Sequence, residues 1–122
     1  MTVVFLLGMV MLVACIPAKD EEKTIAGVVL RTSRYADDIL VCDDGSRDLT
    51  GKIAEKMGVR VLRHERSMGY GVALRTLFEN ALELGGNYVV LLDADGQHNP
   101  DDIPRLVQPL KEGKADMVIG SR

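Results

Sequence analysis

Short apolar runs alternate with longer amphipathic stretches along this chain. The apolar runs cover residues 11–16, 39–42, 59–62, 88–92 and 117–119, and each is followed by Asp, Gly, Pro or a charged residue. Runs of this length between turn-forming residues are typical of strands buried inside a sheet. The pattern therefore predicts five buried strands.

The stretches between these runs carry apolar residues at helical spacing. They predict helices over residues 21–32, 48–57, 71–84 and 100–112. Ser46 or Asp48 is placed to cap the second helix, and Gly58 is placed to end it. Gly85 follows the third helix, and Pro100 stands in the first turn of the fourth. Three of the four predicted helices thus carry a start or stop signal.

The order of these elements predicts the fold class. Strands and helices alternate from residue 11 onward, and the predicted strands are apolar on both faces. This combination is typical of an α/β fold with a mostly parallel sheet between two layers of helices, a three-layer Rossmann-like arrangement. Ligands of such sheets bind beyond the carboxyl ends of the strands, near the point where the strand order reverses. The search for a functional site therefore reduces to the loops that follow the strands.

The first ten residues do not fit this alternation. Residues 3–16 form one uncharged apolar stretch, shorter than the roughly 20 residues needed to span a bilayer. The sequence Leu-Val-Ala-Cys at 12–15 resembles a lipoprotein cleavage site, but no Lys or Arg precedes it, and cleavage would remove the first predicted strand. We therefore expect one domain over residues 11–122 and leave residues 1–10 as an apolar lead-in without an assigned role.

Composition and charge exclude some classes of partner. The 122 residues are 47% hydrophobic and 27% charged, which excludes a disordered chain. A net charge of −3 with no Trp argues against a nucleic-acid partner, because such proteins carry basic patches or aromatic stacking platforms. Cys15 and Cys42 lie in apolar runs without CxxC spacing, so we expect buried free thiols in a reducing, cytoplasmic compartment.

Two carboxylates follow the fourth predicted strand with one residue between them. Asp93 and Asp95 are placed to turn toward a cation beyond the sheet, and Gln97 can add an amide oxygen. Mg²⁺ and Mn²⁺ prefer oxygen ligands, and Mg²⁺ usually takes one or two carboxylates and leaves the remaining positions to water and phosphate. A solvated turn that caps the next helix is the alternative, and it is the commoner use of an isolated acidic pair. His98 is more typical of a surface position than of a metal ligand.

A second acidic pair, Asp43 and Asp44, follows the second predicted strand. Gly45 and Ser46 after it suit a tight turn that leads into a capped helix. Turn chemistry does not explain two adjacent carboxylates, and one of them is placed to accept hydrogen bonds from a base or ribose, as acids do in α/β nucleotide sites. The two glutamates at 21 and 22 are explained by the favourable field at the start of the first helix.

Other classes of phosphate chemistry do not fit the sequence. The GYG segment at 69–71 lacks the third glycine of a dinucleotide-binding loop, because Leu74 stands there. No GxxxxGK[ST] segment is present, which excludes a P-loop. A phospho-receiver domain also gathers acids at strand ends, but it needs a Lys after the last strand, where this chain has GSR at 120–122.

Five segments together resemble a known family. They are IPAKDEE at 16–22, DDGSRD at 43–48, GYGVA at 69–73, DADGQH at 93–98 and GSR at 120–122. In this order they resemble the family 2 glycosyltransferases of GT-A fold. The similarity looks closest to the branch that contains the dolichyl-phosphate mannose synthases and related polyprenyl-phosphate sugar transferases. It runs from about residue 13 to residue 122 and so covers nearly the whole chain.

The resemblance implies a nucleotide-sugar pocket and a metal site. The implied pocket residues are Pro17, Lys19, Glu21, Cys42, Asp44, Asp93, Ala94, Asp95, Gln97 and Arg122. Asp44 is expected to face the base, and Arg122 to reach a phosphate. The expected ligands of Mg²⁺ or Mn²⁺ are Asp93, Asp95 and Gln97. Lys19 and Gly96 depart from the mannose synthases, which tend to have an aromatic residue and often Leu there, so the base and the sugar stay open.

The resemblance also implies a reaction. Such an enzyme moves a hexose from a UDP- or GDP-sugar to an acceptor with inversion, and polyprenyl phosphate is the acceptor that the resemblance favours. The metal and Arg122 neutralise charge on the leaving diphosphate, which makes Asp93, Asp95 and Arg122 the expected catalytic residues. We expect work at the cytoplasmic face of a membrane, with any tether in missing or separate segments. Because such enzymes continue into an acceptor-binding region, we expect a chain truncated at its C-terminus; the alternative is a non-catalytic nucleotide-sugar-binding module.

Overall fold

A computed structural model describes residues 1–5, 11–115 and 117–120, with the backbone alone at residues 4 and 5. The strands are β1 (Thr2–Phe5), β2 (Leu12–Ala18), β3 (Asp38–Asp44), β4 (Arg60–His64), β5 (Tyr88–Leu91) and β6 (Met117–Ile119). The helices are α1 (Ile25–Thr32), α2 (Thr50–Lys56), α3 (Tyr70–Glu83) and α4 (Ile103–Lys111), with a 3₁₀ turn, η1 (Pro100–Asp102), before α4. The five predicted strands and four predicted helices are therefore all present, with ends shifted by a few residues.

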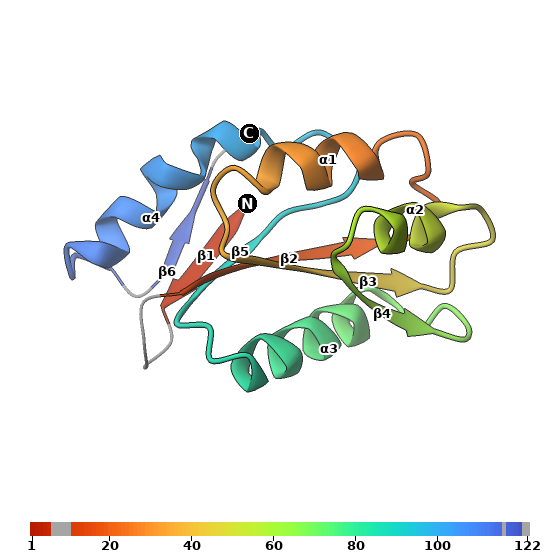
Figure 1. The fold of residues 1–122 in the computed structure, drawn as a ribbon. Coiled ribbons are helices and arrows are strands. Elements are labelled where there is room, and N and C mark those ends of the chain that lie inside the picture. Colours follow the sequence, from red (N-terminus) through yellow and green to blue (C-terminus); the bar gives the residue numbers. More distant parts are fainter. Residues whose placement is uncertain (6–10, 116, 121–122) are drawn as a thin grey trace.

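The strands form one six-stranded sheet in the order β4-β3-β2-β5-β1-β6 (Figure 1). β2 pairs in parallel with β3 and with β5, and β3 pairs in parallel with β4. β1 is antiparallel to both β5 and β6, so β6 runs in the same direction as β5. All five predicted strands thus run one way, which confirms the α/β fold with a mostly parallel sheet.

β1 is the strand that the sequence pattern did not predict. It fills the slot between β5 and β6, where Val3 pairs with Val90 on one side and with Val118 on the other. Val3 is fully buried in this position. Residues 2–5 therefore have a structural role, whereas residues 6–10 of the apolar lead-in lie outside the described part of the chain.

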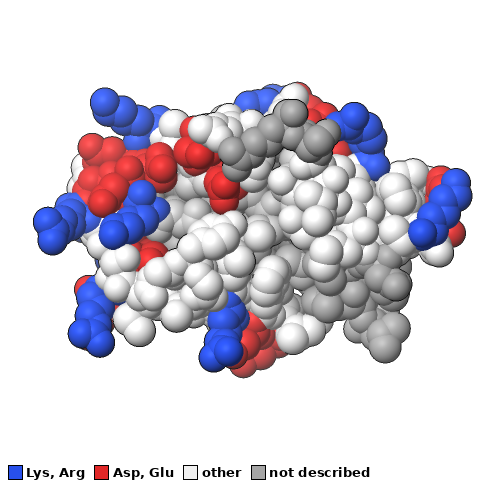
Figure 2. Space-filling view, turned by 180° about the vertical axis from the view of Figure 1, so that it is seen from behind, with Lys and Arg blue, Asp and Glu red and all other residues white. Residues whose placement is uncertain are grey.

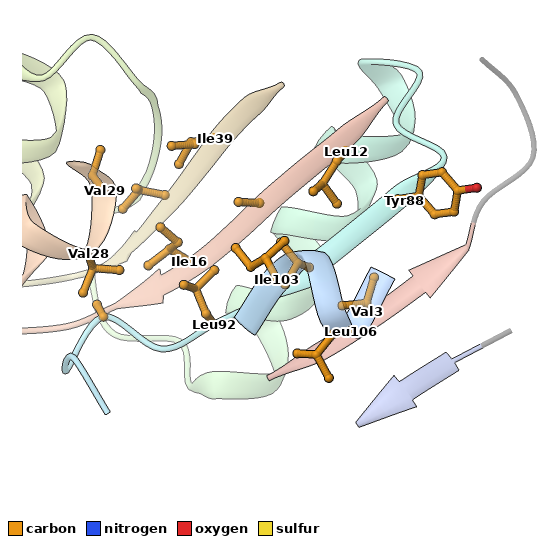
Figure 3. Packing of buried hydrophobic residues seen from close by; sticks show 14 of the residues in the cluster. Val3, Leu12, Ile16, Val28, Val29, Ile39, Tyr88, Leu92, Ile103 and Leu106 are labelled. Atoms are coloured by element: carbon orange, nitrogen blue, oxygen red, sulfur yellow. The ribbon is translucent and has the colours of Figure 1, made fainter. Parts of the chain in front are cut away.

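Helices cover both faces of the sheet, as the fold class requires (Figure 1). Side chains from α1, α2 and α4 form one core with alternate residues of the strands, and Figure 3 shows Ile16, Leu92 and Ile103 within it. On the opposite face α3 packs Leu77 and Ala81 against β2 and β3. The two-sided burial explains why the central strands read as continuous apolar runs rather than as alternating ones.

The prediction that all five strands are buried is wrong for β4 and β6. The residues of β4 and β6 are exposed or half-exposed, because each strand lies at an edge of the sheet in the described structure. Cys15 and Cys42, in contrast, are fully buried free thiols on central strands, as predicted. Burial raises the pKa of both thiols to about 12, with a further contribution at Cys42 from nearby aspartates. Within the described residues, no helix has the length and apolarity needed to cross a bilayer.

Candidate functional site

A cavity of about 370 Å³ lies beyond the carboxyl ends of β3, β2 and β5. Its lining residues are Pro17, Ala18, Lys19, Glu21, Asp44, Ser67, Gly69, Tyr70, Ala73, Asp93, Ala94 and Asp95. The chain leaves β2 toward β3 on one side and later returns to β5 on the other, so the strand order reverses here. Figure 2 shows acidic side chains gathered at the end of the molecule where β2 and β3 end. The cavity therefore has the position that the fold class predicts for a ligand.

Most of the predicted site residues meet in this cavity. Those that line it are Pro17, Lys19, Glu21, Asp44, Asp93, Ala94 and Asp95. The side chain of Cys42 is fully buried under α3 instead, with its Sγ 3.8 Å from Nε2 of His64. Gln97 lines a separate, smaller cavity together with Arg105. Arg122 lies outside the described residues.

Hydrogen bonds tie the loop after β2 to the loop after β3. The backbone N–H of Asp20 donates to Ser46 Oγ at 2.9 Å, and the N–H of Arg47 donates back to Asp20 Oδ1 at 2.8 Å. The N–H of Glu21 donates to Thr50 Oγ1 at 2.8 Å. These bonds hold Asp20 at a positive φ of 52°, a conformation that a non-glycine residue seldom adopts. The two loops therefore form one wall, from which Lys19 and Glu21 line the cavity.

Glu21 and Glu22 do not lie in the first turn of α1, which begins at Ile25. Glu22 instead accepts a hydrogen bond from the N–H of Leu49 at 3.1 Å, directly before α2. Its own N–H donates to Asp48 Oδ2, also at 3.1 Å. The interpretation as a charge in the first turn of α1 is therefore wrong for Glu22, whose carboxylate accepts a hydrogen bond at the start of α2. Glu21 lies just before α1, where its carbonyl accepts the N–H of Ile25 at 2.9 Å.

Asp44, the last residue of β3, accepts four hydrogen bonds. Its Oδ1 accepts from His64 Nδ1 and from the N–H of Met68, both at 2.8 Å. Its Oδ2 accepts from the N–H of Gly69 at 3.0 Å and from Ser67 Oγ at 3.1 Å. The carboxylate thus holds the loop between β4 and α3 against the end of β3. Ser67 and Gly69 become part of the cavity wall because of this attachment.

The charge state of Asp44 follows from these contacts. Burial alone would raise the pKa of this carboxyl group, which is only 6% exposed. The hydrogen bonds from Met68, His64, Gly69 and Ser67 outweigh burial and lower the pKa to about 2. Asp44 therefore presents a carboxylate, an acceptor without a proton to donate, across the neutral range.

The same loop also passes very close to Gly45. Gly45 has a φ of +71°, and a Cβ there would meet the backbone of Arg66 and Ser67, with Arg66 C at 2.6 Å. Real Cβ atoms do not approach other atoms so closely, so a side chain at this position must push the loop away. Only glycine lets this part of the cavity wall close.

Gly45→Ala is expected to lower the free energy of unfolding by about 2–4 kcal/mol, the sum of strain at positive φ and the clash with the loop. Gly58→Ala is the matched control, because Gly58 has a φ of +84° with no atom within 4 Å of a new Cβ. The control should cost only about 1 kcal/mol. Urea denaturation of the two variants measures the difference, and equal losses would show that the close approach contributes nothing.

The loop after β5 carries the second acidic pair. The N–H of Asp93 donates to His98 Nδ1 at 3.1 Å, and the N–H of Gln97 donates to Asp95 Oδ1 at 3.0 Å. Tyr70 Oη lies 3.5 Å from Asp93 Oδ1, at the outer limit of a hydrogen bond. These contacts shape the loop so that Asp93 and Asp95 both line the cavity. His98 instead lines the smaller cavity that Gln97 also lines.

The donor set of this loop fits a hard divalent cation that shares its ligands with a substrate. Within the described chain, no group of three or more His, Cys, Asp or Glu side chains is arranged to hold a metal by itself. Two carboxylates from Asp93 and Asp95 on one cavity wall are the number that Mg²⁺ usually takes from a protein when phosphate and water supply the rest. The residues therefore fit Mg²⁺ or Mn²⁺ whose remaining ligands come from outside the chain.

Five lining residues were not among the predicted site residues: Ala18, Ser67, Gly69, Tyr70 and Ala73. Tyr70 and Ala73 lie in the GYGVA segment, which fails as a dinucleotide-binding loop and belongs to the family resemblance without an assigned role. Because the start of α3 faces the strand ends, the position of these two residues at the start of a predicted helix could have indicated that they line the site. Ser67 carries no local signal, because the ERSM segment at 65–68 reads as an ordinary polar loop.

An α/β domain with a cavity of about 370 Å³ at the strand reversal, lined by acidic side chains, has the features of a nucleotide-binding domain. Comparison with protein families identifies which kind of nucleotide-binding domain this is. Residues 13–122 match the family described as glycosyl transferase family 2, and the chain belongs to this family. The resemblance seen in the five sequence segments is thereby confirmed.

Several named proteins are similar to this chain. It is 39% identical to a UDP-N-acetylglucosamine–dolichyl-phosphate N-acetylglucosaminyltransferase of Methanococcus voltae over 88% of the chain and 50% of that protein. It is 35% identical to a polyprenol monophosphomannose synthase of Mycolicibacterium smegmatis over 88% of the chain and 43% of that protein. The chain thus spans about half, or less, of the length of these curated relatives.

A solved structure has a similar fold. Glucosyl-3-phosphoglycerate synthase from Mycobacterium tuberculosis, in complex with Mn²⁺, UDP-glucose and phosphoglyceric acid, superposes with a TM-score of 0.70 and 31% sequence identity. The match covers 85% of this chain and 40% of that one. The likeness confirms the GT-A type of α/β fold.

Proposed function

We propose that this chain is the donor-binding part of a metal-dependent, inverting glycosyltransferase. The donor is a UDP- or GDP-sugar, the cation is Mg²⁺ or Mn²⁺, and the acceptor is a polyprenyl phosphate at the cytoplasmic face of a membrane. The observation that carries the proposal is the cavity in which Asp93 and Asp95 at the end of β5 share a wall with Asp44 at the end of β3. The dolichyl phosphate and polyprenol for which the two relatives are named support the choice of acceptor.

The two acidic regions of the cavity fit the nucleoside and the diphosphate of a nucleotide sugar. β2 separates β3 from β5, so Asp44 and the acidic pair lie about two strand spacings, roughly 10 Å, apart along the sheet edge. This distance suits a nucleoside at Asp44 and a diphosphate at Asp93 and Asp95. The presence of both UDP-glucose and Mn²⁺ in the similar solved complex supports this division of the cavity.

The chemistry of transfer requires charge neutralisation. Cleavage between the anomeric carbon and the diphosphate leaves negative charge on the departing phosphate, and a bound divalent cation supplies positive charge there. Asp93 and Asp95 would bind that cation in the cavity, and Arg122 is proposed to add a second positive group. A phosphate acceptor is already ionised at neutral pH, so attack on the sugar from the opposite face needs no general base.

Calorimetry tests the proposal with UDP-glucose, UDP-N-acetylglucosamine and GDP-mannose, each with and without Mn²⁺. We expect at least one to bind with a Kd between about 1 µM and 1 mM, the range of typical enzyme KM values, and only when the cation is present. Turnover is then measured with a polyprenyl phosphate. Absence of binding for all three donors would contradict the proposal.

A further inference from the structure

We propose that Thr24 is a positioning residue for the loop after β5, and that its hydroxyl sets how Asp93 and Asp95 are presented to a divalent cation. Thr24 lies directly before α1, and the chain after β5 passes beside α1 on its way to α4 (Figure 1). Thr24 Oγ1 donates at 2.5 Å to the backbone carbonyl of Ala94, the residue between the two aspartates. The inference rests on the proposed binding of a cation by Asp93 and Asp95.

Thr24 occupies the N-cap position of α1 but does not cap the helix. Threonine is favoured at an N-cap because its hydroxyl oxygen accepts a hydrogen bond from a backbone N–H of the first turn. In the described structure the Thr24 side chain makes no such bond, and its hydroxyl instead contacts a residue 70 positions further along the chain. A bond that would stabilise the helix is thus given up for a contact with the loop after β5. Such departures from a local rule are expected at functional sites.

The Thr24 hydroxyl has one proton to donate, and the acceptors around it lie at unequal distances. The carbonyl of Ala94 is at 2.5 Å, whereas Oε2 and the carbonyl of Glu21 are at 3.3 and 3.4 Å. Hydrogen bonds between a hydroxyl and an oxygen measure about 2.5–3.0 Å. The proton therefore goes to Ala94, and the bond across to the loop is the main contact of this hydroxyl.

Thr24 itself is held in a fixed position. Its N–H donates to the carbonyl of Glu21 at 3.1 Å, and its own carbonyl accepts the N–H of Val28 at 3.1 Å. The next residue, Ile25, is fully buried in the core. The hydroxyl therefore projects from a rigid part of the fold and can hold a loop in place.

The loop after β5 is held both from within and from outside. Asp95 Oδ1 accepts the N–H of Gln97 at 3.0 Å, within the loop. Thr24 holds Ala94 from outside, and a Cβ at Gly96 would lie 3.9 Å from the methyl carbon of Thr24. Because the peptide bond is planar, the direction of the Ala94 carbonyl also sets the direction of the N–H of Asp95. The hydroxyl thus fixes the backbone that joins the two carboxylates.

The affinity for a cation depends on this backbone, because two carboxylates bind one ion together only at a suitable separation. Loss of a group that orients metal ligands from behind typically weakens metal binding by about 10–100-fold. Thr24 acts on Asp93 and Asp95 through the peptide between them, so we expect an effect near the lower value. A role at the start of α1 alone would lower stability without changing the concentration of cation that the site requires.

The test compares Thr24→Val, which removes the hydroxyl at nearly constant volume, with Thr24→Ser, which keeps it. Mn²⁺ is titrated into the full chain with UDP, and in parallel with GDP, and calorimetry gives the Mn²⁺ concentration for half-maximal nucleotide binding. Thr24→Val should raise this concentration about tenfold, and Thr24→Ser should stay within about threefold of the parent chain.

The outcomes of this titration are distinct. An unchanged Mn²⁺ requirement in Thr24→Val, or equal losses in Thr24→Val and Thr24→Ser, would overturn the role of the hydroxyl and leave the proposed function standing. Absence of Mn²⁺-dependent binding of both nucleotides to the parent chain would overturn the proposed function and the role of Thr24 together.

Thr32→Val is the matched control, because it makes the same change at the other end of α1. The Thr32 hydroxyl is buried and has no hydrogen-bond partner among the described residues. Its loss should leave the Mn²⁺ requirement unchanged. A rise as large as that in Thr24→Val would show that the requirement follows the stability of α1, and it would overturn the proposal.

Amide hydrogen exchange without ligand separates the loop from the helix. The N–H groups of Asp93 and Gln97 donate within the loop, and they should exchange about fivefold or more faster in Thr24→Val than in Thr24→Ser. The N–H groups of Val28 and Val29 in α1 should exchange at similar rates in both variants. Faster exchange in α1 with an unchanged loop would show that Thr24 serves only the start of the helix and would overturn the proposal.

Discussion

Replacement of Asp95 by Ala is expected to weaken the Mn²⁺-dependent binding of a UDP-sugar by about 10- to 100-fold. One of the two carboxylates on the cavity wall is lost, and a single charged contact is worth roughly 1.5–3 kcal/mol. Without Mn²⁺ neither the parent chain nor the variant should bind the donor. Calorimetry with and without the ion therefore measures the loss in the Mn²⁺-dependent affinity.

Asp102→Ala is the matched control for this variant. Asp102 carries the same charge on the same segment after β5, but its carboxylate is exposed, pairs with Arg105 at 3.4 Å and does not line the donor cavity. Its replacement should leave UDP-sugar binding within a factor of two. Unchanged Mn²⁺-dependent binding in a folded Asp95→Ala protein would remove Asp95 from the metal site.

The second large effect is expected at Asp44. Asp44→Asn should lower the free energy of unfolding at pH 7 by about 2–4 kcal/mol, because the amide nitrogen cannot accept the hydrogen bonds that one carboxylate oxygen receives. The loop between β4 and α3 should loosen with it. Urea denaturation measures the stability, and amide hydrogen exchange of Met68 and Gly69 measures the loop.

The same residue predicts how stability depends on pH. The pKa of Asp44 is about 2 in the folded chain against an ordinary 3.8, so the group stabilises the fold fully above pH 4. That contribution, about 2 kcal/mol, is lost as pH falls from about 4 to 2. The Asn variant should lack this part of the pH dependence.

Asp38→Asn, at the opposite end of β3, is the control for Asp44→Asn. Asp38 is less buried and pairs with the exposed Arg60 at 3.4 Å, an interaction of small expected worth. Asp38→Asn should lower the free energy of unfolding by less than about 1 kcal/mol. If Asp38→Asn and Asp44→Asn lose the same stability, Asp44 does not anchor the loop.

The positions of the strands in the sequence were largely predictable, because the residues that mark a strand and its end are close together in the chain. The apolar runs at 11–16, 39–42 and 88–92 end at Pro or Asp, and the structure ends the strands within two residues of those positions. β1 had no such boundary inside the apolar stretch 3–16. Its strand conformation comes from pairing with β5 and β6, which no pattern within residues 1–10 reports.

Some residues of the candidate site were likewise predictable from local sequence signals, and others were not. Asp93 and Asp95 directly follow a buried strand, so their place at the sheet edge follows from the pattern. Cys42 lies two residues before Asp44 and therefore points to the same face of the sheet. Residues of α3 cover Cys42 on that face, so it does not line the cavity. Ser67 reaches the site only through contacts with residues more than twenty positions away, which a sequence pattern does not contain.

The position of β1 sets an order on the assembly of the sheet. Residues 2–5 are synthesised well before the strands they pair with, since Val3 pairs with Val90 and Val118. Such distant pairing closes a long loop and is slow to form. In the described part of the chain β6 pairs with no strand except β1, so β6 cannot join the sheet until β1 has inserted beside β5. β1 therefore joins the sheet only after strands that are synthesised much later, and until then the edge of β5 is open to any extended segment that reaches it.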